Sequence, residues 1–358
     1  MAKKSSSRKK SATNKKSARY CSLREPPERT FAASVTPGRM RLIRPNASKW
    51  VNGTVLHYYF FKQPASWKGK PAELEIVRQA FKKWKNVGTG LEFKEVDSPD
   101  EAEVRIGFLR GDGAWSYLGK DVLNQGISER TMNFGWDISN DIDTAIHEIG
   151  HTLGFSHEHQ NPFAGIVWDE EAVYAALARP PNNWDRDKTW WNIIRKINPD
   201  EVQGSRWDPD SIMHYPFGPG MILQPEQYHT TGLNPKPGLS NADKEWLTEF
   251  YPALKTQLPK ISPFKFIRLS LKPSEQVNYE VEVPATRKYN FGTFGNADTV
   301  MVLFEEVGGE PRYLIGDDDS GSDRNARFNV KLFSGRKYTL RVRLYWAYKK
   351  GDFGLLMW

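Results

Sequence analysis

The 358-residue sequence contains a single cysteine, Cys21. One cysteine cannot form an intramolecular disulfide, so packing and hydrogen bonds must hold the fold together. The sequence also lacks any apolar run long enough to span a bilayer, and no apolar stretch follows the N-terminal charges as it would in a secretory signal peptide. We therefore expect a protein that is cytoplasmic or is exported by a non-classical route.

Acidic residues are absent from the first 20 positions, "MAKKSSSRKKSATNKKSARY", which contain eight Lys and Arg. The other 43 Lys and Arg balance all 43 Asp and Glu, so the net charge of +8 belongs to this tail. A Ser/Lys-rich segment cannot bury a core. We expect residues 1–39 to form a disordered basic tail and connector, with a pro-segment as one alternative. Contact with nucleic acid or an anionic membrane surface is another.

Two regions with different residue patterns follow the tail. A hydrophobic content of 39% and 13 Trp in the whole chain indicate a globular fold. The first of the two regions is residues 40–254. Mixed patterns predict strands at 54–61, 91–96, 102–109 and 131–137, and helices beginning near Pro71 and over 169–178, 189–197 and 239–252. In residues 262–358, apolar residues alternate with polar ones, as in "VNYEVEVP" and "KYTLRVRLYW", which predicts an antiparallel β-sandwich. The fold class is therefore α+β.

Histidine is scarce, yet four of the seven histidines lie within "HEIGHTLGFSHEH". His147 and His151 are four residues apart, so on a helix they face the same point. Gly154 can adopt a positive φ, which lets the helix end and brings His157 back toward the first two. Three neutral imidazoles leave one open position on a tetrahedral Zn²⁺. A water bound there would be activated by Glu148, which would pass its proton to the leaving amine.

The spacing His-Glu-x-x-His-x-x-Gly-x-x-His is the metzincin signature, and all five of its fixed positions are present. A second segment, "SIMHYPFG", places Met213 after the third histidine, where metzincins have a methionine-containing turn beneath the metal. Alone, Met213 would indicate ordinary core packing. We do not expect His214 to be a fourth ligand.

On "HEIGHTLGFSHE" and Ser211–Tyr215, residues of roughly 40–252 resemble the astacin-type metzincin peptidases. The resemblance implies a twisted mixed β-sheet with an active-site helix, one catalytic zinc on His147, His151 and His157, and Glu148 as general base. It implies that Tyr215 is a switchable fifth ligand that stabilises the oxyanion, and that Glu158 pairs with the mature N-terminus. It also implies that "TMNFG" is the edge strand that binds substrate. Matrixins share the zinc motif, and "AWSYLG" is similar to them.

The astacin disulfides and an aspartate-switch propeptide are missing from this sequence, which leaves the mechanism of latency open. A Cys21 thiolate could cap the zinc, as in matrixin propeptides, but the residues around Cys21 match that motif poorly. A free surface cysteine is therefore the favoured interpretation.

The C-terminal region loosely resembles bacterial pre-peptidase C-terminal domains on "FGNADTVMVLFEE" and "DDDSGSDRNARF". Asp317, Asp318 and Asp319 could bind Ca²⁺ through carboxylate oxygens. A run of Asp, Ser and Gly is more often only a turn.

These patterns together predict a zinc metalloendopeptidase acting on polypeptide substrates. One alternative is a catalytically inactive binding module that keeps the fold, against which the intact Glu148 argues. A second is a nucleic-acid-associated protein whose tail does the main work, which would show salt-sensitive affinity without peptidase activity.

Overall fold

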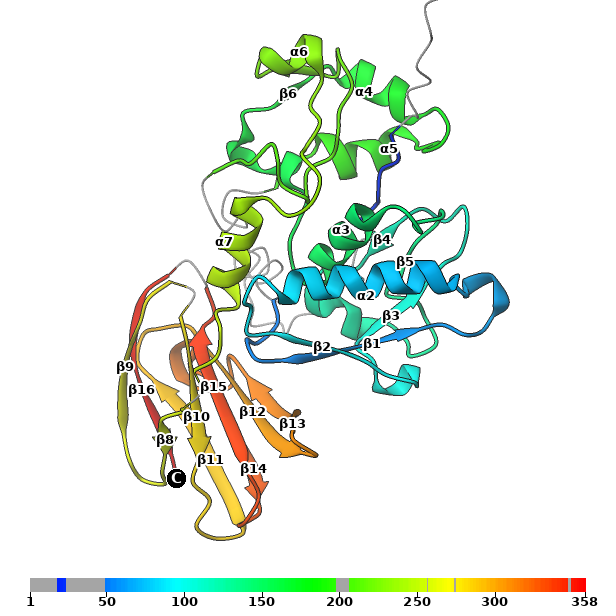
Figure 1. Ribbon diagram of the computed structural model, residues 1–358. Helices are drawn as coiled ribbons and strands as arrows, with labels where there is room; N and C mark the ends of the chain where they lie inside the picture. The colour runs from blue at the N-terminus through cyan, green and yellow to red at the C-terminus, as the bar shows by residue number, and fades with distance from the viewer. Residues whose placement is uncertain (1–17, 24–48, 198–205, 256, 274, 347–348) are drawn as a thin grey trace, which may run out of the picture.

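The computed structural model describes residues 18–23, 49–197, 206–255, 257–273, 275–346 and 349–358 (Figure 1). Most of the basic tail and most of the connector after it lie outside these ranges, so the predictions made for them do too. No helix in the described part of the chain is long and apolar enough to cross a membrane.

A five-stranded sheet forms the first half of the structure, in the order β2-β1-β3-β5-β4. All neighbouring strands are parallel except β4 and β5, which are antiparallel, so the sheet is mixed, as predicted. Its strands are β1 (Val55–Phe60), β2 (Glu92–Glu95), β3 (Val104–Gly107), β4 (Trp115–Ser116) and β5 (Met132–Asn133).

Two helices pack on one side of this sheet (Figure 1). Helix α2 (Pro71–Lys85) begins at a proline, whose fixed φ suits the first turn. Its Val77, Phe81 and Trp84 are buried in the core shared with α3 (Ile142–Thr152) and the sheet. The Trp84 indole N–H donates to the carbonyl of Ile146 at 2.9 Å, which fixes α3 against α2.

The chain between α3 and β8 is less regular. It contains the π-helical turn η6 (Trp190–Ile194) where the sequence predicts an α-helix, and a two-stranded sheet of β6 (Val167–Trp168) and β7 (Ile222–Gln224). Its helices are α4 (Glu170–Leu177), α5 (Arg186–Thr189), α6 (Gln227–Thr231) and α7 (Asn241–Phe250). Its short 3₁₀ turns are η4 (Glu158–Gln160) and η5 (Pro162–Ala164), while η1 (Ala65–Trp67), η2 (Pro99–Glu101) and η3 (Gly119–Asn124) lie among the strands of the first sheet.

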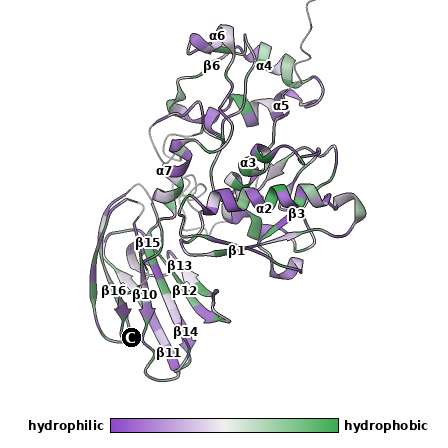
Figure 2. Cartoon of the chain, in the orientation of Figure 1, coloured by the Kyte–Doolittle hydropathy of each residue, from purple (hydrophilic) through white to green (hydrophobic). Residues whose placement is uncertain are grey.

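The C-terminal region is β-rich, and its strands carry hydrophilic and hydrophobic residues side by side (Figure 2). Two sheets, in the orders β13-β12-β15-β10-β8 and β14-β11-β16-β9, contribute side chains to one hydrophobic cluster. One pair departs from the predicted antiparallel arrangement, because β8 runs parallel to β10. The elements are β8 (Lys260–Ile261), β9 (Ile267–Leu271), β10 (Gln276–Val281), β11 (Arg287–Phe294), β12 (Thr299–Val307), β13 (Glu310–Asp317), η8 (Ser322–Arg324), β14 (Arg327–Leu332), β15 (Tyr338–Leu344) and β16 (Gly351–Met357).

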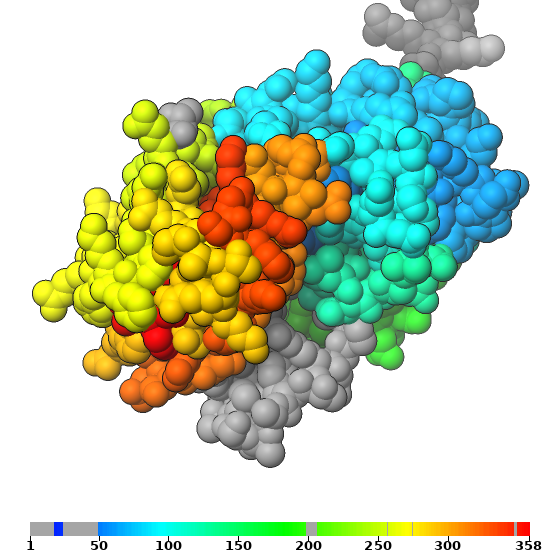
Figure 3. Space-filling view, turned by 90° about the horizontal axis from the view of Figure 1, so that it is seen from below, coloured from blue at the N-terminus to red at the C-terminus, as the bar shows by residue number. Residues whose placement is uncertain are grey.

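The C-terminal region contacts the first sheet through polar groups, and the two lie against each other in the view from below (Figure 3). The carboxylate of Glu310 pairs with Lys94 and lies 3.3 Å from Nε2 of His57. The guanidinium of Arg341 donates to the carbonyl of Gly53 at 2.7 Å. These contacts hold the C-terminal region at the β1–β2 side of the sheet.

Candidate metal centre

Helix α3 presents two histidines on one face. It begins at Asp141, whose carboxylate accepts hydrogen bonds from the backbone N–H of Thr144 (3.2 Å) and from its hydroxyl (2.7 Å), as expected for an N-cap. His147 and His151 follow on consecutive turns and are buried. The imidazole rings lie edge to face with centroids 4.7 Å apart, so both point to one place.

The end of α3 turns the chain back toward these histidines. The N–H of Gly154 donates to the carbonyl of His151 (2.8 Å), and the N–H of Phe155 donates to the carbonyl of Gly150 (3.0 Å). This pair of bonds is a Schellman motif, which needs a residue with positive φ, and Gly154 has φ of 95°. The reversal brings His157 within 4.6 Å of the His151 ring, centroid to centroid, as the sequence predicts.

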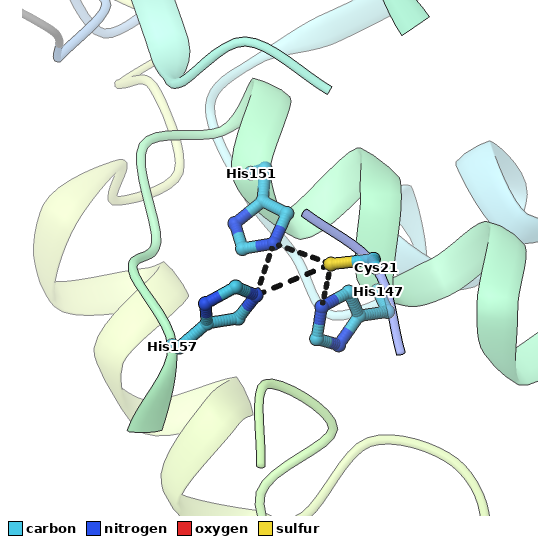
Figure 4. Close-up of side chains that lie close together, drawn as sticks. All are labelled: Cys21, His147, His151 and His157. Carbon is cyan, nitrogen blue, oxygen red and sulfur yellow. Dashed lines mark hydrogen bonds between the residues drawn. The ribbon is translucent and has the colours of Figure 1, made fainter. Parts of the chain in front are cut away.

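Four side-chain donors converge at the centre of the site (Figure 4). The Cys21 sulfur lies 3.2 Å from Nε2 of His147, 3.5 Å from Nε2 of His151 and 3.2 Å from Nε2 of His157. The Nε2 atoms of His151 and His157 are 3.1 Å apart. Among the described residues, this is the one cluster of three or more histidine, cysteine or acidic side chains that could hold a metal ion.

Backbone carbonyls orient the imidazoles. Nδ1 of His147 lies 2.7 Å from the carbonyl of Ile212, and Nδ1 of His151 lies 2.8 Å from the carbonyl of Phe155. A carbonyl can only accept, so each Nδ1 carries the proton and each Nε2 turns a lone pair inward. Burial lowers the pKa of His147 to about 4 and also lowers the pKa of His151 and His157, which keeps all three rings neutral. Neutral rings with a second-shell acceptor are what metal ligation requires.

The spacing of the donors fits zinc. Two imidazole nitrogens bound at about 2.0–2.1 Å to a tetrahedral zinc lie about 3.3 Å apart, and a thiolate bound at about 2.3 Å lies about 3.6 Å from each nitrogen. The observed separations are slightly shorter than these. Four donor atoms that all lie this close to one another match one tetrahedral zinc.

The position of Cys21 corrects the favoured interpretation of this residue as a free surface thiol. Its side chain is 5% exposed and lies among the three histidines. The contact of Cys21 with the histidines could not be predicted from the sequence. At least 126 positions separate Cys21 from these partners, and no helical or strand period relates them.

The turn that contains Met213 lies beneath the histidines and is fixed by helix α7. The carboxylate of Asp243 accepts from the Ser211 hydroxyl (2.6 Å) and from the N–H of Ile212 (2.9 Å), while the carbonyl of Met213 accepts from the N–H of Glu158 (3.0 Å). Asp243 was not among the site residues predicted from the sequence. Its only signal was its place at the third position of a helix that begins after Ser240, where a capping box is expected.

The Met213 side chain packs closely against Gly150 of α3, and this contact leads to a stability prediction. A Cβ on Gly150 would lie 2.4 Å from the Met213 sulfur and 3.3 Å from Trp84. Gly150→Ala would gain up to about 1 kcal/mol of helix propensity but force the methionine aside. We expect a net loss of about 1–2 kcal/mol in the free energy of unfolding, measured by urea denaturation. Gly126→Ala is the control, because its Cβ would meet only Glu129 at 3.7 Å. Equal stability of both variants would contradict the close contact.

Tyr215 reaches the centre from the far side of the turn. Its hydroxyl lies 2.6 Å from Nε2 of His157 and 2.9 Å from the Cys21 sulfur, and it donates to the backbone carbonyl of Cys21 at 2.7 Å. Its neighbour His214 is directed elsewhere, with Nδ1 2.7 Å from the carbonyl of Tyr215, and it is not in the donor cluster.

Glu148 is fully buried beside the donors. Neither carboxylate oxygen forms a regular hydrogen bond with any described residue. Burial raises the pKa of this carboxyl, and the neighbouring Cys21 side chain offsets part of that effect. A buried carboxylate without regular partners indicates a group kept for a ligand or a proton.

Glu158 lines a separate cavity of about 120 Å³ together with Lys49, Asp208 and Asp243. It accepts hydrogen bonds from the N–H of Asp208 and the amide of Asn161, both at 3.0 Å. Burial outweighs these bonds and raises the pKa of Glu158 to about 7. The expected partner of Glu158, a mature N-terminus, is not among these groups.

Two further predictions concern the strand at "TMNFG" and the aspartate-rich turn of the C-terminal region. Strand β5, which lies within "TMNFG", is placed between β3 and β4, so the prediction of this segment as the edge strand is wrong, and β4 is the edge strand on this side of the sheet. Strand β4 has only two residues, too few for an alternating pattern to reveal it. In the "DDDSGSD" turn, Asp317 accepts from the Ser320 hydroxyl and the N–H of Arg327, which is turn geometry, and the calcium prediction stays untested.

The arrangement of α3, its terminal turn, His157 and the turn beneath them defines a metallopeptidase centre of the metzincin type. The family model Astacin, a peptidase family, matches residues 43–218. A solved structure of myroilysin is 33% identical, with a TM-score of 0.52, and the match covers 59% of this chain and 97% of that one. The chain belongs to the astacin family of zinc metallopeptidases.

Curated relatives match part of the chain. Protein SpAN of Strongylocentrotus purpuratus is 29% identical over 39% of this chain and 21% of its own length. Bone morphogenetic protein 1 of Xenopus laevis is 28% identical over 49% of this chain and 24% of its own length. The zinc metalloproteinase nas-36 of Haemonchus contortus is 29% identical over 47% of this chain and 24% of its own length. The chain thus spans about a quarter of the length of these relatives.

Proposed function

We propose that the chain is a zinc-dependent endopeptidase that hydrolyses internal peptide bonds of polypeptides. The observation that carries the proposal is the convergence of three Nε2 atoms, those of His147, His151 and His157, each on a buried and neutral ring. One zinc ion held there would polarise the scissile carbonyl and lower the pKa of the attacking water. The protein's own groups then have to move protons and hold the peptide.

Glu148 is the proton carrier in this proposal. In hydrolysis, a water oxygen bonds to the carbonyl carbon, the C–N bond breaks, and a proton must travel from the water to the departing nitrogen. Glu148 follows a zinc ligand directly, is buried, and has no regular hydrogen bond of its own to give up. Its carboxylate can therefore accept the proton on one side and return it to the amine on the other.

Tyr215 is the donor to the reacting carbonyl. Its hydroxyl already donates to a peptide carbonyl, that of Cys21, at 2.7 Å. A substrate carbonyl in that place would receive the same hydrogen bond, which strengthens as negative charge develops on the oxygen.

Tyr215→Phe tests this role. We expect kcat to fall by about 10²–10³, as for loss of one oxyanion donor, while KM changes little, because the lost hydrogen bond is strongest in the transition state. Steady-state kinetics on a fluorogenic peptide measures both constants. An unchanged kcat would mean that the hydroxyl is structural.

The leader around Cys21 gives the full chain a latent form in this proposal. Residues 18–23 cross the site, and the Cys21 sulfur fills the position that water would need. Residues 1–39 then act as a pro-segment, residues 40–254 as the catalytic domain, and residues 262–358 as a separate domain. We infer that the two sheets of the last domain form a β-sandwich. We also infer that Glu158 pairs with the new N-terminus once the pro-segment has been removed.

Metal analysis combined with a peptide-library digest tests the function. We expect about one zinc per chain and cleavage at internal bonds by protein treated with a mercurial, which modifies the thiol. A chelator should abolish the cleavage and added zinc should restore it. Cleavage that survives complete metal removal would contradict the proposal.

A further inference from the structure

The leader lies in the site as a peptide, and its residue next to Cys21 fills a pocket. Tyr20 is 7% exposed although it belongs to a segment of only six described residues. Its ring packs edge to face on Tyr215, with centroids 5.1 Å apart, and contacts Phe217 at 5.9 Å and Trp184 at 6.3 Å. The pocket therefore encloses one aromatic side chain on three sides.

A polar group receives the hydroxyl of the enclosed ring. The Tyr20 hydroxyl donates to the carbonyl of Pro216 at 2.8 Å. A pocket with aromatic walls and one acceptor suits a phenol, since an aliphatic side chain would leave the acceptor unused and the walls partly empty.

Side-chain amides hold the backbone of the leader. Asn182 makes two bonds: its oxygen accepts from the N–H of Tyr20 (3.1 Å) and its nitrogen donates to the carbonyl of Ala18 (3.1 Å). These bonds read only the peptide backbone, so they are indifferent to the side chains of whatever peptide lies there.

Two more backbone bonds flank Cys21 on its other side. The Asn192 side-chain nitrogen donates to the carbonyl of Lys188, which orients the amide, and the Asn192 oxygen accepts from the N–H of Leu23 at 2.9 Å. The N–H of Ser22 donates to the carbonyl of Ala114, next to edge strand β4, at 3.1 Å. The cleft is thus equipped for an extended chain on both sides of the metal centre.

We propose that Trp184, Phe217 and the Pro216 carbonyl form a specificity subsite for a tyrosine or phenylalanine of the substrate, adjacent to the metal, and that Asn182 binds the substrate backbone. The inference rests on the proposed peptidase function and names its substrate class. It holds for either direction of the substrate chain, because an asparagine amide offers both a donor and an acceptor.

Paired peptides test the subsite. The full chain with Cys21→Ser is given fluorogenic peptides that differ at one residue near the scissile bond, as Tyr, Phe, Leu or Ala. Burial of an aromatic ring predicts kcat/KM about 10–100-fold higher for Tyr than for Ala at one fixed position. Phe should lie between the two, because it keeps the ring contacts but not the hydrogen bond to the Pro216 carbonyl. No cleavage of any peptide would contradict the peptidase function itself. Cleavage of all four at equal rates would overturn only the subsite.

Variants of the cleft separate the two roles. Trp184→Ala should bring the Tyr/Ala ratio of kcat/KM down toward 1. Asn182→Ala should lower kcat/KM for every peptide by a similar factor, about tenfold, and keep the ratio. Trp190→Ala is the matched control, because this tryptophan is 46% exposed, and it should change neither quantity. A Tyr/Ala ratio unaffected by Trp184→Ala in folded protein would overturn the assignment.

A readout without catalysis covers the case in which Trp184→Ala does not fold. Tyr20 belongs to the leader, so replacing it leaves the catalytic core intact. In metal-free protein, Tyr20→Ala should speed labelling of Cys21 by a thiol reagent about 10–100-fold, and Tyr20→Phe by only a few-fold, because Phe keeps the ring contacts. Equal labelling rates for wild type and Tyr20→Ala would mean that the pocket does not hold the ring.

Discussion

Replacement of Glu148 by glutamine should leave the metal bound and remove peptide hydrolysis. Glutamine has nearly the same shape, and Glu148 is not one of the converging donors, so the three imidazoles keep their places. The amide cannot accept the proton that the water must lose. General acid–base catalysis contributes about 10²–10⁴ to the rate, and we expect kcat to fall by at least that much.

The experiment compares zinc content and turnover in the same preparation. Zinc per chain should equal that of wild type, while cleavage of a fluorogenic peptide falls to near background. Glu170→Gln, on the first turn of α4 away from the site, is the control and should keep full activity. Near-wild-type turnover by Glu148→Gln would show that another group carries the proton.

The second large effect concerns Cys21. Cys21→Ala should make the 358-residue chain active without any processing of the leader. The thiol occupies the fourth position among the three imidazoles, 3.2–3.5 Å from their Nε2 atoms, and alanine has no donor to put there. A tenfold rise in the fraction of molecules whose site is free of the leader corresponds to a loss of about 1.4 kcal/mol in the free energy that binds the leader to the site. Loss of a thiolate–metal bond should exceed this, so we expect peptidase activity to rise about 10–100-fold or more.

Initial rates of this chain, measured before any self-cleavage of the leader, test this expectation. Ser22→Ala is the neighbouring control, because only the backbone N–H of Ser22 bonds to the cleft, at 3.1 Å to the carbonyl of Ala114. Treatment of wild type with a thiol reagent should mimic Cys21→Ala. Activity of Cys21→Ala within twofold of wild type would exclude the cysteine as a latch.

The sequence could predict those parts of the site whose residues lie close together in the chain. His147, His151 and Gly154 obey a helical period and a known helix ending, so the helix from Ile142 and its terminal turn were predictable. Longer helices with a clear apolar face, such as α2 and α7, were also predictable.

The parts that the sequence could not predict depend on contacts between distant residues. Cys21 meets His147 across 126 positions, and Asp243 meets Ile212 across 31 positions, with no period to connect them. Strand β4 escapes prediction because its two residues are defined by pairing with β5, which no local preference encodes. Asn182 and Asn192 gave no signal, since lone asparagines in a sequence indicate turns far more often than peptide binding.

The six leader residues touch both sides of the cleft, with Ser22 bonded next to the edge of the first sheet and Tyr20 bonded to Asn182 in the less regular half. The hydrogen bonds of the leader therefore connect the first sheet to the less regular half across the cleft. If these residues leave, as we propose, the cover over the donor cluster and the hydrogen bonds across the cleft are lost together. Removal of the leader should thus loosen the connection between the two sides of the cleft and open the donor cluster to substrate in the same step.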